Sequence, residues 1–141
     1  MTYESYVKGR LIDLVMEEAY HNGGYEPMLA VAQVIANRVR AGWNGGDWLK
    51  NIAAAPQYRG TVPEERPNPD PRSGNFRELL RRIDDVYFHI ADDSNVNVED
   101  HKALYYTELH NTTREWFKAH VLEDLDSHPR IATVGQMTFF A

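Results

Sequence analysis

The stretch PMLAVAQVIANRVRAG, residues 27–42, predicts the central helix of this chain and decides how the rest can fold. Proline suits the first turn of a helix, where an N–H group has no partner within the helix, and glycine suits its end. The apolar residues lie nearly all round it: Met28, Leu29, Val31, Val34, Ile35 and Val39. A helix that is apolar on most sides is buried on most sides. We therefore expect the other elements to pack around this helix.

The flanking sequence predicts further helices and a small β element. Apolar residues at helical spacing, and alternating or β-prone runs, give the following expectations. Helices are expected at 3–20, 47–55, 75–92 and 112–125, and strands at 103–107 and on either side of Gly135 in 130–141. Most of the prolines fall in 56–74, which is predicted to be one long surface loop. The expected fold class is mostly helical α+β, in one domain covering residues 1–141.

Composition excludes several classes of function. The 141 residues include no cysteine, so disulfides, thiolate nucleophiles and thiolate metal sites are impossible. The net charge is −6, and without a basic stripe it argues against nucleic acid as a partner. No stretch is long and apolar enough for a membrane span, and the N-terminal sequence lacks the apolar core of a signal peptide. We expect a cytoplasmic chain, or one that leaves without a cleaved signal.

The adjacent carboxylates Glu17 and Glu18 raise the question of catalysis. Helical spacing from Leu11 and Leu14 places Glu18 on the apolar stripe, whereas Glu17 falls on the polar side with Asp13. A carboxyl group on a buried stripe should have a raised pKa, which suits a general acid. Helical phase alone nevertheless favours the alternative that Glu18, at the end of the helix, points to water.

Other catalytic and metal patterns are not supported. The six histidines lack metal-ligand spacing, and no G-x-S-x-G motif is present. The polar stretch 92–100 hints at a calcium loop, but Val98 and Leu104 occupy the positions that need glycine and glutamate. We therefore expect no metal and no cofactor.

Several segments together resemble a known family. They are EEA (17–19), AVAQVIANRV (30–39), NIAAAPQY (51–58), ALYY (103–106), Trp116 and IATVGQMTFF (131–140). This set is similar to the SleB-type cell-wall hydrolases, also called hydrolase family 2, which include spore-cortex-lytic and phage-borne peptidoglycan-cleaving enzymes. The match runs from about residue 12 to the end, and its most specific part is the glutamate with Asn37-Arg38-Val39 downstream.

The resemblance implies a lysozyme-like fold with a substrate groove and one catalytic glutamate, at Glu18. Enzymes of this kind act as lytic transglycosylases. The acid protonates the oxygen between N-acetylmuramic acid (MurNAc) and N-acetylglucosamine (GlcNAc), and the 6-hydroxyl of the sugar then closes an anhydro ring. Ordinary glycosidases need two carboxylates, whereas this internal attack needs only one. Without that ring closure the reaction would be a hydrolysis, which needs a second catalytic carboxylate, and Glu26 and Asp47 are the first candidates for it.

The sequence departs from the family pattern at three positions. Glu17 and Lys102 stand where the family has glycine, and Met137 stands where it has histidine. These departures support an alternative, a phage structural protein that keeps the scaffold without catalysis. A third hypothesis is an acidic interaction domain that binds a protein through its proline-rich loop.

The expected partner is bacterial peptidoglycan, with other virion proteins of the tail or internal core as further candidates. The expected location is the host cytoplasm before release to the wall, as for an endolysin, or the phage virion. The candidate substrate contacts are Asn37, Gln57, Tyr58, Tyr105 and Tyr106. Rings with a polar tip can stack on sugars, and an amide can bind an N-acetyl group. For each of them the alternative is a role in the core, and for Asn37 that role is a satisfied amide holding loop backbone.

Overall fold

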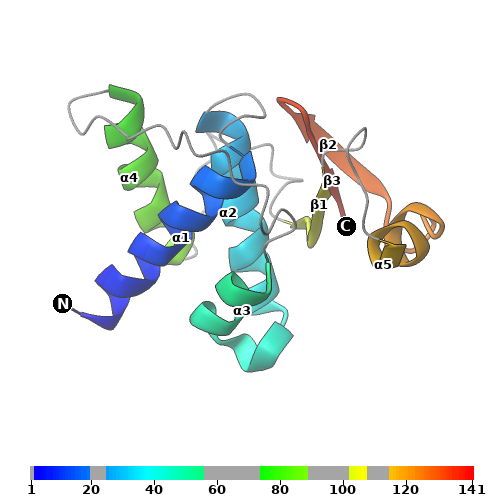
Figure 1. The fold of residues 1–141 in the computed structure, drawn as a ribbon, viewed down its shortest axis with the longest axis horizontal. Coiled ribbons are helices and arrows are strands. Elements are labelled where there is room, and N and C mark those ends of the chain that lie inside the picture. The colour runs from blue at the N-terminus through cyan, green and yellow to red at the C-terminus, as the bar shows by residue number, and fades with distance from the viewer. Residues whose placement is uncertain (1, 20–24, 56–73, 89–101, 108–114) are drawn as a thin grey trace.

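A computed structural model of the chain describes residues 2–19, 25–55, 74–88, 102–107 and 115–141. The helices in order are α1 (Tyr3–Ala19), α2 (Tyr25–Arg40), the 3-10 turn η2 (Trp43–Gly46), α3 (Trp48–Ala54), α4 (Gly74–Tyr87), α5 (Glu115–Phe117) and the π-helical turn η5 (Lys118–Leu122). The strands are β1 (Tyr105–Thr107), β2 (Arg130–Val134) and β3 (Met137–Phe140). The α+β class with a predominance of helix is confirmed (Figure 1).

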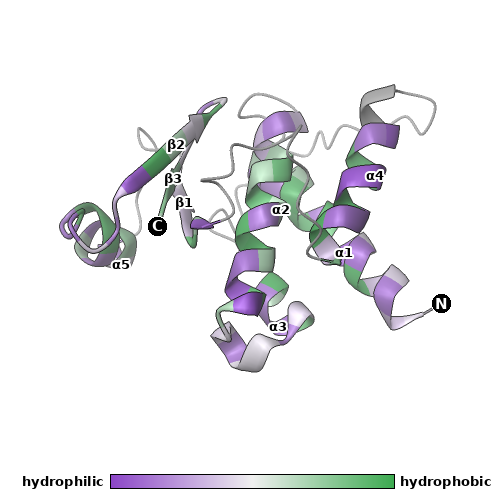
Figure 2. Cartoon of the chain, turned by 180° about the vertical axis from the view of Figure 1, so that it is seen from behind, coloured by the Kyte–Doolittle hydropathy of each residue, from purple (hydrophilic) through white to green (hydrophobic). Residues whose placement is uncertain are grey.

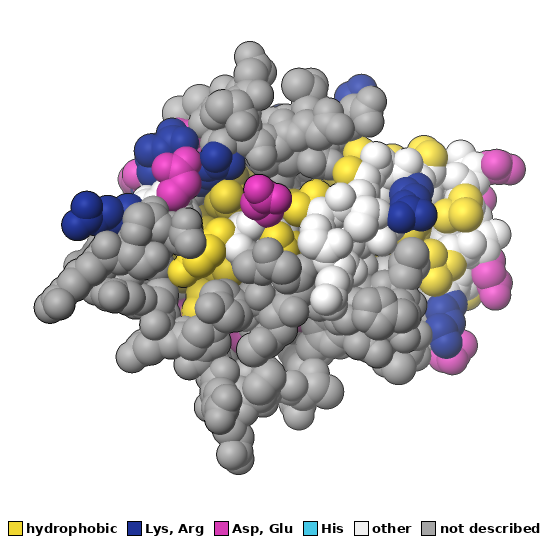
Figure 3. Space-filling model, turned by 90° about the horizontal axis from the view of Figure 1, so that it is seen from above, with side chains coloured by type: hydrophobic (Ala, Val, Ile, Leu, Met, Phe, Trp, Pro, Cys, Tyr) yellow, Lys and Arg dark blue, Asp and Glu magenta, His cyan; other side chains and the backbone are white. Residues whose placement is uncertain are grey.

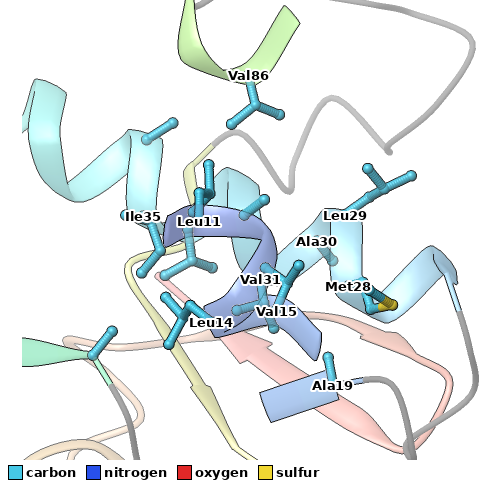
Figure 4. Packing of buried hydrophobic residues seen from close by; sticks show 14 of the residues in the cluster. Leu11, Leu14, Val15, Ala19, Met28, Leu29, Ala30, Val31, Ile35 and Val86 are labelled. Carbon is cyan, nitrogen blue, oxygen red and sulfur yellow. The ribbon is translucent and has the colours of Figure 1, made fainter. Parts of the chain in front are cut away.

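Helix α2 is the centre of the molecule, as its sequence predicts. Every residue from Pro27 to Arg38 is buried, and α1, α3, α4, η2 and the sheet all pack against it. Figure 4 shows side chains of α1, such as Leu14 and Val15, meeting Val31 and Ile35 of α2. Because α2 is covered on all sides from Pro27 to Arg38, each polar side chain in that range must find a partner inside the protein.

The sheet has three strands in the order β1-β3-β2, and both pairings are antiparallel. The predicted hairpin around Gly135 is confirmed, and Gly135 has the positive φ of 58° that such a turn requires. Strand β3 is buried along its whole length because it lies between the other two strands. In its register Tyr106 lies opposite Phe139.

Some element boundaries differ from the prediction. Helix α2 begins at Tyr25, which still leaves Pro27 within the first turn, where its missing N–H costs nothing. Gly74, expected in the proline-rich loop, begins α4. The predicted helix at 112–125 appears, from residue 115 onward, as a short α-helix that continues into the η5 turn and ends at Leu122. The strand expected at 103–107 begins only at Tyr105.

Helix α4 covers one side of the core. Purple, hydrophilic residues make up much of the α4 ribbon in Figure 2. On this helix Glu78 forms ion pairs with Arg81 and Arg82. On the face shown in Figure 3, most basic side chains lie beside acidic ones. No helix in the described ranges has the length and apolar character to cross a membrane.

The packing of α4 can be tested with two adjacent leucines. Leu79 is fully buried, whereas Leu80 is 41% exposed. We expect Leu79→Ala to lower the free energy of unfolding by about 2–5 kcal/mol, because it removes buried carbons and leaves a cavity. Leu80→Ala should lower it by less than about 1 kcal/mol. Urea unfolding followed by circular dichroism measures both, and equal losses would contradict this orientation of α4.

Candidate active site

Glu18 lies in the last turn of α1 and points into the protein. Its side chain is 2% exposed, whereas the neighbouring Glu17 is only partly buried. The hydroxyl group of Tyr106 donates a hydrogen bond to Glu18 Oε1 at 3.0 Å. The alternative that Glu18 points to water is therefore wrong. Glu18 is buried on the same face of α1 as Leu11 and Leu14.

Three distant segments meet at this carboxyl group. Glu18 comes from α1 and Tyr106 from β1, and Ala55 follows the end of α3. The carbonyl oxygen of Ala55 lies 3.4 Å from the Tyr106 hydroxyl, so the same donor also faces the backbone after α3. Strand β1 keeps Tyr106 in place through its pairing with β3. The hydroxyl of Tyr106 is thus the link between all three segments.

Helix α2 fixes the residues that lead into β1. Asn37 Nδ2 donates to the carbonyl oxygen of Ala103 at 2.8 Å, and Arg38 Nε donates to that of Leu104 at 2.8 Å. Gln33 Nε2 donates to Asn37 Oδ1 at 3.0 Å, so the Asn37 amide both accepts and donates. Asn37, predicted as a substrate contact, is 5% exposed and instead holds backbone. This is the alternative role considered for it, and it follows from the burial of α2.

The two tyrosines of β1 face opposite sides of the sheet, but neither is exposed. Tyr106 is buried in the main core beside Glu18, so it meets the carboxyl group and not open solvent. Tyr105 packs with Phe117, Val121 and Phe140 in a second cluster, because the alternation of a strand sends it the other way. Its hydroxyl lies 3.3 Å from Nε2 of a histidine in η5. Both tyrosines, predicted as substrate contacts with a core role as the alternative, are therefore buried.

Arg38 is a site residue that the sequence interpretation missed. It is 6% exposed, and its guanidinium carbon lies 4.8 Å from the centre of the Trp43 ring and 5.8 Å from that of the Tyr106 ring. Burial lowers the pKa of the Arg38 guanidinium, while the Tyr106 hydroxyl and the Glu18 carboxyl group act in the opposite direction. An arginine on a helix that is apolar all round was the available indication, since such a cation must be buried too.

A pocket of about 170 Å³ lies next to this group of residues. Its lining residues are Arg38, Trp43, Asn44, Asn51, Ala54, Ala55 and Trp116. Glu18 is not among the lining residues. Two of the lining residues, Arg38 and Ala55, also contact Tyr106, which is the residue that binds Glu18. The arrangement therefore combines a buried carboxyl group, a hydroxyl group that orients it, and a cation facing a small cavity.

Two further candidate residues, Gln57 and Tyr58, lie outside the described residues. In the part of the chain that is described, no three His, Asp or Glu side chains gather as a metal site would require. Comparisons of the sequence with protein-family models and curated proteins, and of the fold with solved structures, find no match. Function is therefore inferred from the residues and their geometry.

The contribution of the hydrogen bond between Tyr106 and Glu18 to the free energy of unfolding can be measured. We expect Tyr106→Phe to lower the free energy of unfolding by about 1–3 kcal/mol, because it leaves a buried acceptor without this donor. The matched control is Tyr105→Phe, whose hydroxyl contact is longer and partly exposed, with an expected loss of less than about 1 kcal/mol.

A double-mutant cycle with Glu18→Gln separates this contact from the other interactions of the two residues. The coupling energy between positions 18 and 106 should exceed about 0.5 kcal/mol. Additive losses in urea unfolding would show that the two side chains do not stabilise each other.

Proposed function

We propose that this chain cleaves the glycan strands of bacterial peptidoglycan between MurNAc and GlcNAc, on a lysozyme-like fold, with Glu18 as the acid. The observation that carries the proposal is the Glu18 carboxyl group, which is 2% exposed and is oriented by a tyrosine hydroxyl. Burial disfavours the ionised form of a carboxyl group, whereas the positive charge of Arg38 favours it. Opposing influences of this kind suit a group that must both release a proton and take it back.

The proposed chemistry is that of a lytic transglycosylase. Glu18 transfers its proton to the glycosidic oxygen, and the bond from that oxygen to C1 of MurNAc breaks. The 6-hydroxyl oxygen of the same MurNAc bonds to C1, and its proton returns to the Glu18 carboxylate. No water is consumed, and one carboxyl group serves first as acid and then as base. Tyr106 would hold Oε1 in one orientation through both transfers.

The positions of the two other candidate carboxylates favour this route over hydrolysis. The Asp47 side chain caps α3 by accepting a hydrogen bond from the backbone nitrogen of Lys50 at 2.8 Å. Glu26 is exposed in the first turn of α2. Neither lines the pocket. A hydrolase would need one of them, or another carboxylate, positioned as a base or nucleophile.

The alternative is a phage structural protein that keeps the scaffold without catalysis. The burial of Glu18 also fits this alternative, since a carboxyl group inside a core can serve only to hold neighbouring segments. The departures from the family pattern support it less. Met137 is fully buried in the core and Lys102 is exposed, so these two substitutions bear on packing and on the surface. In either case we propose a phage protein, acting as an endolysin or carried in the virion.

The deciding experiment compares wild type, Glu18→Gln and the matched control Glu17→Gln on peptide-trimmed peptidoglycan, with mass spectrometry of the released sugar ends. We expect anhydro-muramyl ends from wild type and Glu17→Gln, and at least a ~100-fold slower release from Glu18→Gln, because a general acid contributes roughly 10²–10⁴-fold. Unfolding curves check that both variants fold.

The other outcomes are equally informative. Reducing ends of normal mass would replace the transglycosylase by a hydrolase with a second carboxylate. Equal activity of Glu18→Gln and wild type would refute the role of Glu18. No product from folded wild type would favour the structural protein.

A further inference from the structure

Arg38 has donors that the described part of the chain does not use. Its Nε is bonded to the carbonyl oxygen of Leu104. Within the described residues, no hydrogen bond or close ion pair involves its two terminal nitrogens. Buried cations are usually paired, because taking a charge out of water is costly unless a partner replaces the water. A guanidinium that is 6% exposed and still has free donors is therefore unusual.

The guanidinium is also held in a fixed place. The ring of Trp43 lies on it at 4.8 Å and that of Tyr106 at 5.8 Å, and Nε is anchored on backbone. Such contacts restrict the plane of an arginine and leave its terminal nitrogens as the donors for another group. Because Arg38 lines the pocket, a ligand there would meet a pre-oriented fork of N–H groups.

The polar side chains that line the pocket, apart from Arg38, form hydrogen bonds within the pocket wall. Asn51 Nδ2 donates to the carbonyl oxygens of Trp43 and Asp47 at 2.7 and 2.8 Å, and Asn51 Oδ1 accepts from Asn44 Nδ2 at 3.0 Å. Asn44 has a φ of 53°, in the left-handed region that costs energy for most residues. Asn51 thus holds the turn that shapes the pocket, and among the lining residues only Arg38 carries a charge.

The shape and the remaining lining indicate what could bind. A pocket of about 170 Å³ is small compared with the roughly 300–1,000 Å³ of sites that enclose a whole ligand. It suits a substituent, with the rest of the molecule outside. Trp116 lines the pocket and is 46% exposed, so its ring is available to the face of a sugar.

We propose that this pocket is an anion subsite in which Arg38 binds a carboxylate carried by the muramyl residue of the substrate. The choice of a muramyl ligand rests on the proposed function, whereas the choice of a carboxylate rests on the free donors of Arg38. GlcNAc has no carboxylate, so the subsite would recognise the muramyl side of the cleaved bond. The carboxylate is that of the lactyl ether where the peptide stem has been removed, or one on the stem itself.

The test is direct binding, measured by tryptophan fluorescence and NMR with four probes. They are MurNAc, its methyl ester, GlcNAc, and muramyl dipeptide, whose lactyl group is an amide and whose carboxylate lies on the peptide. We expect MurNAc to bind about 10- to 100-fold more tightly than its methyl ester or GlcNAc, the range for a charge-assisted hydrogen bond. Tighter binding of MurNAc than of the dipeptide would assign the lactyl carboxylate, and the reverse would assign the stem.

Arg38→Lys keeps the charge but loses the fork, and we expect most of the preference for MurNAc over its ester to disappear. Because this variant also loses the bond to Leu104, the comparison of ester and acid on wild type serves as a test that needs no variant. Equal binding of MurNAc and its methyl ester to wild type, with no tighter binding of muramyl dipeptide, would overturn the proposal, as would the absence of binding by both MurNAc and muramyl dipeptide.

Binding and cleavage separate the two proposals. If wild type prefers the acid to the ester but releases no sugar ends, the subsite stands and the proposed activity fails. If it cleaves glycan strands but prefers neither MurNAc nor muramyl dipeptide to the methyl ester, the activity stands and the subsite fails.

Discussion

Two hydrogen bonds from buried side chains of α2 decide where β1 can lie. Asn37 and Arg38 sit on the covered part of α2, so their side-chain donors need acceptors inside the protein. The carbonyl oxygens of Ala103 and Leu104 accept these hydrogen bonds. With those two residues fixed, β1 starts beside α2, and its side-chain alternation turns Tyr106 toward Glu18. The geometry of the candidate site is thus a consequence of satisfying polar groups in the core.

Local pattern accounts for much of the fold. The apolar residues all round 27–39 predicted a central helix, and the stripe through Leu11 and Leu14 put Glu18 on the apolar face, although its place at the helix end favoured a side chain pointing to water. Those inferences needed only a helical period. The pairing of β1 with β3 and the meeting of Glu18 with Tyr106 depend on residues 88 positions apart. Helical or strand periodicity contains no information on such distances, so the orienting hydroxyl could not be assigned from the sequence.

The missed role of Arg38 and the misplaced role of Asn37 share a physical cause. Asn37 was weighed by residue type, because an amide can bind a sugar, and Arg38 was given no role of its own. The decisive property is which partners remain after folding. Asn37 uses its amide on Gln33 and Ala103, whereas Arg38 donates one hydrogen bond to the described residues and leaves its terminal nitrogens unbonded among them. Counting donors and acceptors requires the neighbours, which only the three-dimensional structure supplies.

Under the two proposals together, the closeness of Arg38 and Glu18 would couple substrate binding to acid catalysis. Without a ligand, the Glu18 carboxyl group is among the groups that favour the charged form of Arg38. A ligand carboxylate bound to the terminal nitrogens of Arg38 would itself stabilise the charged guanidinium. It would also place a second negative charge near Glu18. Like charges in a buried site disfavour each other, so the ligand carboxylate and an ionised Glu18 would repel. The neutral carboxyl group, which the proposed proton transfer requires, avoids this repulsion.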